Sequence, residues 1–309
     1  MKKQILIAVD GSSYSSQSLE YIALLFEDRP EIDLHLTTCI SSSESAFPVA
    51  ADSSNSLTPE FPGVQKKRLA AQDLLQKAAD KLVRLEISPE RIKTSVTNSG
   101  QDIGATIQQQ AEHLLVDSIL IGRRGLNTLS EMLLGSVSAT LLQKCHRIPL
   151  WILDGAVANK NFLAPVDGSL PSLLAIDHLA HIMEGRQDIT LFLFHCNRFF
   201  GKKIEANPAA FYHIWDKEWC DTHLVDDDHL FRGPTQLLIE AGIPEDNIII
   251  LPETVDLEPA HSILRQADKN HCGTIVIGRR GDGTASGLLG GVSDRTIRHG
   301  QDVALWLVG

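Results

Sequence analysis

The sequence predicts an α/β protein built as two tandem doubly wound domains, each an open parallel sheet with helices on both faces. Two observations predict this architecture. Short apolar runs alternate with amphipathic segments along the whole chain of 309 residues, which is the pattern of parallel strands covered by helices. The second half of the chain also repeats the first at an offset of 155 to 157 residues. A period this long indicates duplication of a whole domain.

The repeat is carried by segments that occur once in each half. The VDGS sequence, the IGRRG sequence and a final apolar segment ending in Trp each occur twice, at residues 9–12 and 166–169, 121–125 and 277–281, and 148–151 and 303–306. We therefore expect a first domain over residues 1–154, a linker over 155–160 and a second domain over 161–309.

The elements of the first domain follow from periodicity. Residues 4–9 are a short apolar run ending at Asp10, which predicts a buried parallel strand. Residues 12–16 supply helix-starting serines, and the apolar residues that follow fall on one helical face. Further strands are expected at 32–40, 92–97, 118–122 and 148–153, helices at 64–85, 102–115 and after Gly135, and a Ser- and Pro-rich loop at 41–63.

The second domain is expected to repeat this order. Strands are predicted at 161–166, 189–195, 248–251, 274–277 and 303–308, and helices at 170–183, 229–241, 259–269 and 293–299. Residues 197–228 read as an atypical insert that holds six aromatic side chains: Phe199, Phe200, Phe211, Tyr212, Trp215 and Trp219. This segment is too aromatic for a disordered linker, so we expect it to pack on the other domain, a partner or an apolar ligand.

Composition excludes several classes of protein. Apolar residues make up 43% of the chain and charged residues 22%, as in ordinary globular proteins. A net charge of −11 argues against nucleic acid or an anionic membrane as a partner. No run is long enough to span a bilayer, and the apolar run that ends at Asp10 is too short for a signal peptide. Five cysteines without a C-x-x-C pair predict reduced thiols and a cytoplasmic protein.

One stretch of the first domain is suited to hold phosphate. The apolar strand 118–122 runs into Arg123, Arg124 and Gly125, and a second glycine, Gly135, opens a helix nine residues later. Backbone N–H groups at such a turn and helix entry form an anion site. The side chains of Ser136 and Ser138 are candidate hydroxyl donors. The alternative is structural: a tight turn at the glycines and a simple helix cap at the serine.

The combination resembles the universal stress protein family over both halves of the chain. The motif Gly-x2-Gly-x9-Gly-Ser is matched by Gly122, Gly125, Gly135 and Ser136, and the family's aspartate after the first strand by Asp10. The resemblance implies a five-stranded parallel sheet of the adenine nucleotide alpha hydrolase-like type, related to the Rossmann fold. It also implies ATP, or AMP or ADP, at the carboxyl ends of the strands, with or without Mg. Open α/β sheets bind ligands at that edge.

The resemblance assigns a role to each matched residue. Asp10 would contact the ribose, and the backbone near Thr38 and Cys39 the adenine. The phosphates would be held by the strand turn and the helix entry, through Gly122, Arg123, Arg124, Gly125, Gly135, Ser136, Val137 and Ser138. A carboxylate repels phosphate, so Asp10 is expected at the far end of the nucleotide. The structural alternative for Asp10 is to cap the first helix.

The second half departs from the motif. Asp167, Gly278 and Gly281 match the first half, but Gly291 stands where the serine is expected, or Val292 stands there if nine residues are counted. Ser293 is expected to match Ser138. Asp282 adds negative charge to the loop, which opposes phosphate. Weaker binding is therefore expected at Asp167, Gly278, Gly281, Gly291 and Ser293.

Other catalytic and metal patterns are not convincing. There is no G-x-x-x-x-G-K-[ST] sequence, so P-loop chemistry is unavailable. Cys220 and His223, with acidic residues at 226–228, fit no standard zinc spacing. His195 and Cys196 are adjacent on a strand and point to opposite faces, which makes a poor nucleophile pair. No catalytic or metal residue is assigned.

The favoured function is a nucleotide-binding regulatory protein of the stress response, in which ATP shifts a conformation or an interface. The alternatives are an enzyme that hydrolyses ATP or transfers an adenylyl group, at most with slow turnover or autophosphorylation on Ser136 or Ser138, and a binder of an apolar ligand through residues 197–228. The two domains are expected to form a pseudo-dimer whose final strands pair edge to edge. Whether two copies of the whole chain also form a homodimer is left open.

Overall fold

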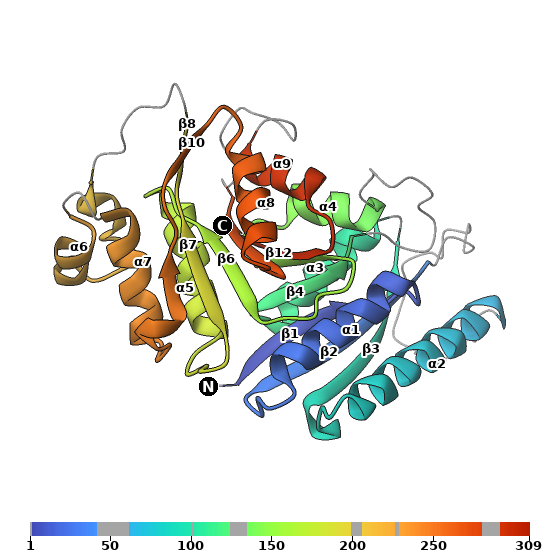
Figure 1. Cartoon of the computed structure of the whole chain (residues 1–309). Coiled ribbons are helices and arrows are strands. Elements are labelled where there is room, and N and C mark those ends of the chain that lie inside the picture. The colour runs from blue at the N-terminus through green and yellow to red at the C-terminus, as the bar shows by residue number, and fades with distance from the viewer. Residues whose placement is uncertain are drawn as a thin grey trace. The chain divides into compact units, whose positions relative to one another are not determined.

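The computed structural model describes residues 2–41, 62–100, 102–123, 135–198, 206–225, 229–279 and 291–309 (Figure 1). The chain divides into two compact units, with the division after Lys144 in the described part. Within the described residues, no helix combines the length and the apolar character that crossing a bilayer requires.

Unit 1 contains a parallel sheet in the order β3-β2-β1-β4. Its strands are β1 (Lys3–Ala8), β2 (Ile32–Ser41), β3 (Ile92–Ser99) and β4 (Ser118–Gly122). Its helices are α1 (Ser13–Phe26), α2 (Pro62–Arg84), α3 (Ile103–Leu114) and α4 (Ser136–Lys144), with a 3-10 turn η1 (Pro89–Arg91). α1 packs with α2, and α3 with α4. Right-handed crossovers to the two sides of β1 put these pairs on opposite faces.

Unit 2 contains a sheet in the order β5-β12-β11-β6-β7-β9. Its strands are β5 (Leu150–Asp154), β6 (Asn161–Pro165), β7 (Thr190–Phe194), β9 (Ile248–Ile250), β11 (Thr274–Gly278) and β12 (Val303–Val308), and β8 (Cys196–Arg198) pairs separately with β10 (Thr254–Asp256). Its helices are α5 (Leu170–Ile182), α6 (Lys217–His223), α7 (His229–Glu240), α8 (Pro259–Lys269) and α9 (Val292–His299), with 3-10 turns η2 (Pro208–Phe211) and η3 (Glu245–Asn247). α5 packs with α7, and α8 with α9.

The predicted fold class is confirmed: each copy of the repeat supplies parallel strands covered by helices. Burial explains the sequence pattern, since the first four residues of both β4 and β11 are buried. Strands covered on both faces read as continuous apolar runs. The pair formed by β8 and β10, and helix α6, were not predicted.

The predicted edge-to-edge pairing of the two final strands is also confirmed. β5 and β12 are antiparallel, with Trp151 opposite Trp306. Their rings stack at a centroid distance of 3.8 Å and an interplanar angle of 2°. Trp151 Nε1 donates a hydrogen bond of 3.2 Å to His178 Nε2 on α5. These contacts group β5 with unit 2, although the sequence repeat places this strand at the end of the first copy.

A buried polar cluster joins β2, β3 and α3 in unit 1. His35 Nε2 lies 2.7 Å from Ser95 Oγ, which accepts a hydrogen bond of 2.6 Å from Gln110 Nε2. Gln110 Oε1 in turn accepts from Thr37 Oγ1 at 2.7 Å. Burial, followed by the charge of Lys93, lowers the pKa of His35 below its usual value.

This shift predicts a pH-dependent stability. The unfolded chain, with a histidine pKa of about 6.5, binds a proton at His35 more readily than the folded chain does. The contribution of His35 to the free energy of unfolding is therefore present above about pH 6.5 and lost as the pH falls below it. In urea unfolding between pH 8 and pH 5, the free energy of unfolding of His35→Gln should depend less on pH than that of the parent. The same pH dependence in both proteins would contradict the assignment.

Candidate functional site

Three strand ends of unit 1 meet at one edge of its sheet. β1 pairs with β2 so that Ala8 lies opposite Thr37, and with β4 so that Ile7 lies opposite Leu120. Continued along the strands, this register places Asp10 beside Cys39 on one side and Arg123 on the other. Adjacent strands are about 4.8 Å apart. The structure thus brings the predicted residues Asp10, Cys39 and Gly122 together.

The turn after β1 orients the carboxylate of Asp10. Asp10 Oδ1 accepts a hydrogen bond of 2.9 Å from the Ser12 N–H, and Gly11 between them has a φ of +81°. Such a positive φ favours glycine. Ser12 is the N-cap of α1, since its Oγ accepts from the Ser15 N–H at 3.2 Å. The alternative role of Asp10 as the helix cap is therefore wrong, and its side chain stays exposed at the sheet edge.

The start of α4 returns to the end of β4. The Gly135 N–H donates to Arg123 O at 3.0 Å. Ser138 Oγ, which is buried, donates to Gly122 O at 3.1 Å and Arg123 O at 3.2 Å. Because the Ala139 N–H is the first to bond within the helix, to Gly135 O, the N–H groups of residues 136–138 have no intrahelical acceptor. N–H groups at a helix N-terminus are donors of the kind that anion sites use.

These contacts separate the roles of the predicted phosphate residues. The hydroxyl of Ser138 is committed to two carbonyl groups, whereas Ser136 is exposed and can present its hydroxyl to a ligand. Arg123 is buried, so its guanidinium is not displayed at the surface. The Val137 N–H is one of the three N–H groups without an intrahelical acceptor. Arg124, Gly125 and Gly281 lie outside the described residues.

Cys39 offers no nucleophile at this edge. Burial raises the pKa of its thiol to about 11, so the thiol is protonated at neutral pH, and the thiolate is the reactive form. In the part of the chain that the structure describes, no three His, Cys, Asp or Glu side chains gather as a metal site.

Unit 2 repeats the turn at the first strand. Asp167 Oδ1 accepts from the Ser169 N–H at 3.0 Å and from Ser169 Oγ at 2.5 Å, and Gly168 has a φ of +69°. Ser169 is the N-cap of α5, as Ser12 is of α1. The aspartate end of the site is thus the same in both units.

The helix entry of unit 2 differs. Gly291 is the N-cap of α9, and its carbonyl accepts from the Arg295 N–H at 3.2 Å, as the Gly135 carbonyl accepts from Ala139 in unit 1. Gly291 is therefore the counterpart of Gly135, which places Val292 at the position of Ser136 and Asp294 at that of Ser138. The expectation that Ser293 matches Ser138 is wrong by one residue, because Ser293 matches Val137. A carboxylate in this first turn repels phosphate.

Gly278 has a packing role that needs no ligand. A Cβ on this residue would lie 2.2 Å from Pro171 O and 2.3 Å from Pro171 C, in the first turn of α5. The end of β11 can approach α5 this closely only with glycine, so packing alone accounts for Gly278 in unit 2.

A polar chain at the edge of unit 2 was not predicted. His195 Nδ1 lies 2.6 Å from Val166 O and its Nε2 lies 3.0 Å from Asn197 Oδ1, while Asn197 Nδ2 donates to Glu253 Oε2 at 3.1 Å. Both ring nitrogens of His195 thus face oxygen atoms and not Cys196, in agreement with the rejection of a Cys/His pair. The residues meet only in the fold, and no sequence spacing indicates them.

The fold and the strand-end site define a duplicated α/β protein of the doubly wound class. The family model "Universal stress protein family" matches residues 1–153 and 158–303. The chain belongs to the universal stress protein family.

Two solved structures that cover nearly the whole chain agree with this fold. A universal stress protein from Archaeoglobus fulgidus DSM 4304 is 19% identical, with a TM-score of 0.62 over 99% of this chain and 95% of that chain. A functionally unknown protein from Pseudomonas aeruginosa PAO1 is 16% identical, with a TM-score of 0.57 over 99% of this chain and 92% of that chain. A universal stress protein in complex with cAMP matches 49% of this chain and 96% of its own, at 16% identity and a TM-score of 0.33. No curated protein matches the sequence.

The close approach of β11 to α5 at Gly278 can be tested by substitution. Gly278→Ala should lower the free energy of unfolding by about 1–3 kcal/mol, the usual cost of overpacking a close contact. Gly100→Ala is the control, since a Cβ there would meet nothing within 4 Å. Urea unfolding of both variants measures the difference. Equal stability of the two would show that β11 and α5 are not held this closely.

Proposed function

We propose that unit 1 binds an adenine nucleotide, with ATP as the physiological ligand, and that unit 2 binds it weakly or not at all. The observation that carries this proposal is the return of α4 to the end of β4. The bonds of Gly135 and Ser138 hold three N–H groups at the same edge as the exposed carboxylate of Asp10.

The charges favour one orientation of the nucleotide. The phosphates lie at the first turn of α4, where N–H groups and the helix dipole favour anions. The ribose lies at Asp10, whose Oδ2 accepts no hydrogen bond from the described residues. The adenine lies along the end of β2, at the backbone of Thr38 and Cys39. In this orientation the carboxylate hydrogen-bonds the ribose hydroxyl groups and is distant from the phosphates. A Mg ion would be bound together with the phosphates.

The first turn of α9 argues against a second phosphate site. Unit 2 keeps the aspartate turn, but Val292 removes the exposed hydroxyl and Asp294 adds a negative charge where Ser138 stands in unit 1. A carboxylate at a helix N-terminus competes for the same N–H groups that would bind phosphate.

A regulatory role fits the site better than catalysis does. Asp10 is bonded to the Ser12 N–H at the ribose end, and the Cys39 thiol is protonated, so neither is a base or nucleophile at the phosphates. ATP would act by binding one conformation of the protein more tightly than another. The five cysteines form no disulfide, which fits a role in the reducing cytoplasm.

The aspartate turns provide a matched pair of variants. Asp10→Ala and Asp167→Ala break the same turn in the two units, so their structural effects should be alike. Only Asp10→Ala should weaken ATP binding, by about tenfold or more, the effect of losing a hydrogen bond to a charged group. Non-denaturing mass spectrometry and calorimetry with Mg-ATP should give one nucleotide per chain, abolished by Gly125→Val and retained in Gly281→Val.

Three results would contradict the proposal. Two nucleotides per chain would mean that unit 2 also binds, and equal losses in both aspartate variants would mean that the effect is structural. Phosphate release well above background, lost in Gly125→Val, would make the protein an enzyme.

A further inference from the structure

Unit 2 replaces the long second helix of unit 1 with two short ones. In unit 1, α2 has 23 residues, and Leu82 O near its end accepts from the Ile87 N–H; in unit 2, Leu238 O accepts from Ile243 in the same way. The offset between these pairs is 156 residues, so the first turns of α2 correspond to residues in α6. Cys39 and Cys196 differ by 157. Residues 197–228 therefore correspond to a segment of nearly equal length in the first copy and are not an insertion.

The broken helix packs on its own unit. Trp215 stacks with Trp219 at 6.2 Å, and its side chain hydrogen-bonds Asp177 on α5. Trp219 Nε1 donates to Glu240 Oε1 on α7 at 3.0 Å. The described part of the aromatic segment is packed, as expected, but the surface it covers is α5 and α7 of its own unit, which was not among the expected surfaces. Phe199 and Phe200 lie outside the described residues.

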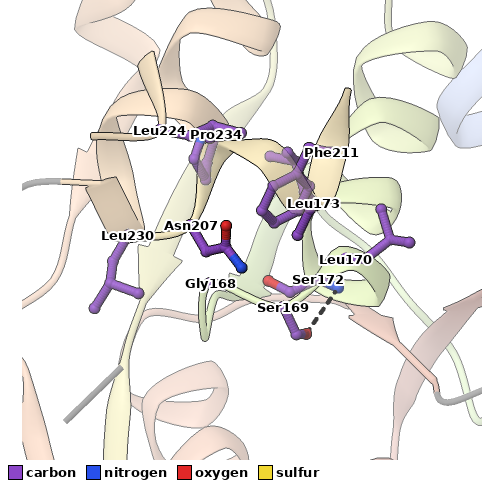
Figure 2. Close-up of a pocket in the computed structure, with 11 residues that line it drawn as sticks. Gly168, Ser169, Leu170, Ser172, Leu173, Asn207, Phe211, Leu224, Leu230 and Pro234 are labelled. Carbon is purple, nitrogen blue, oxygen red and sulfur yellow. Dashed lines mark hydrogen bonds between the residues drawn. The ribbon is translucent and has the colours of Figure 1, made fainter. Parts of the chain in front are cut away.

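This arrangement leaves a pocket of about 260 Å³ beside the first turn of α5 (Figure 2). Its wall is mainly apolar and includes Leu173, Phe211, Leu230 and Pro234, with Gly168 at its base and Asn207 between the two sides. The volume is near the lower end of small-molecule sites, which are about 300–1,000 Å³.

The described part of unit 1 has a close contact at the corresponding place. Leu74 of α2 is the counterpart of Leu230, and its Cδ1 lies 3.3 Å from the position that a Cβ on Gly11 would take. In unit 2 the counterpart glycine, Gly168, and Leu230 both face the pocket. In the described residues, the leucine that lies against the glycine in unit 1 is matched in unit 2 by a leucine and a glycine that both line the pocket.

One uncharged polar side chain, that of Asn207, is available in the pocket wall. Pro234 lies inside α7, and its ring adds apolar surface to the wall beside Leu230. Both residues line the pocket. The amide of Asn207 does not cap η2, and no other described residue hydrogen-bonds it. A ligand with a hydrogen-bond donor would be accepted by the amide oxygen of Asn207.

The charges near the pocket oppose an anion. The carboxylate of Asp167 stands next to Gly168 at the pocket base. The N-terminus of α5 has little donor capacity left, because Pro171 has no N–H and the Ser172 N–H bonds to Ser169 Oγ at 3.4 Å. An anion would meet a negative charge and few N–H groups.

We propose that this pocket binds an uncharged apolar molecule of one or two rings that carries a hydrogen-bond donor. The apolar walls bind the rings and Asn207 Oδ1 accepts from the donor. The site is separate from the nucleotide site proposed in unit 1, and its ligand is of a different class.

Indole is a suitable probe, since it is neutral, bicyclic and carries one N–H. Calorimetric titration of the full chain should show one saturable site for indole. 1-Methylindole, without the donor, should bind about fivefold more weakly, the effect of one net hydrogen bond. Indole-3-carboxylate should bind at least tenfold more weakly because of its charge. The series thus tests size, donor and charge separately.

Two neighbouring alanines provide the matched variants. Ala209 and Ala210 are both exposed in η2, but only Ala210 lines the pocket. Ala210→Trp should fill the pocket and raise the dissociation constant of indole at least tenfold. The dissociation constant of Ala209→Trp should stay within twofold of the parent value. Circular dichroism and urea unfolding of both variants check that the fold is retained.

The proposal is overturned by any of three results. No saturable binding of indole up to millimolar concentration would mean that the pocket takes no such ligand. Equal binding to the two tryptophan variants would place the ligand elsewhere. Binding of 1-methylindole or indole-3-carboxylate as tight as that of indole would reject the proposed ligand class.

Discussion

The turn between the first strand and the first helix of each copy is the constraint on which both candidate sites depend. In this turn an aspartate carboxylate accepts the N–H two residues ahead, a glycine adopts a positive φ, and a serine caps the helix. These bonds fix where α1 and α5 begin relative to the sheet. They leave the carboxylate of Asp10 or Asp167 at the strand ends, where open α/β sheets place their ligands.

The same turn serves different purposes in the two units because its surroundings differ. In unit 1 it faces a helix entry that Ser138 ties to β4 by donating to two carbonyl groups. A carboxylate cannot donate such bonds, so Asp294 at the same position in unit 2 cannot close the loop in this way. In unit 2 the turn forms the base of the pocket between α5 and α7. A motif aspartate is therefore evidence of a helix start first, and of a ligand only with its neighbours.

Sequence reasoning predicted the assembly of Asp10, Cys39 and Gly122, because parallel strands end at a common edge and apolar runs mark those strands. It did not separate Ser12 from Asp10 as the helix cap, since both residue types cap helices equally well. It misaligned Ser293 by one residue, because glycines at 290 and 291 offer two registers and only the backbone bond from Arg295 to Gly291 selects one. It identified the aromatic segment as packed, but composition does not specify the surface that is covered.

The glycines show most clearly why a degenerate copy can keep a motif. Gly278 would be retained for packing against Pro171 even if no nucleotide ever bound, since any side chain would collide with backbone atoms. Gly168 would be retained for its positive φ. By contrast, a hydroxyl at the first position of α9 has no packing partner to preserve it, and unit 2 has Val292 there. In this chain the position with a packing role is glycine in both copies, whereas the position without one is serine in the first copy and valine in the second. The exposed Ser136 is thus a better marker of a nucleotide site than the glycines that precede it.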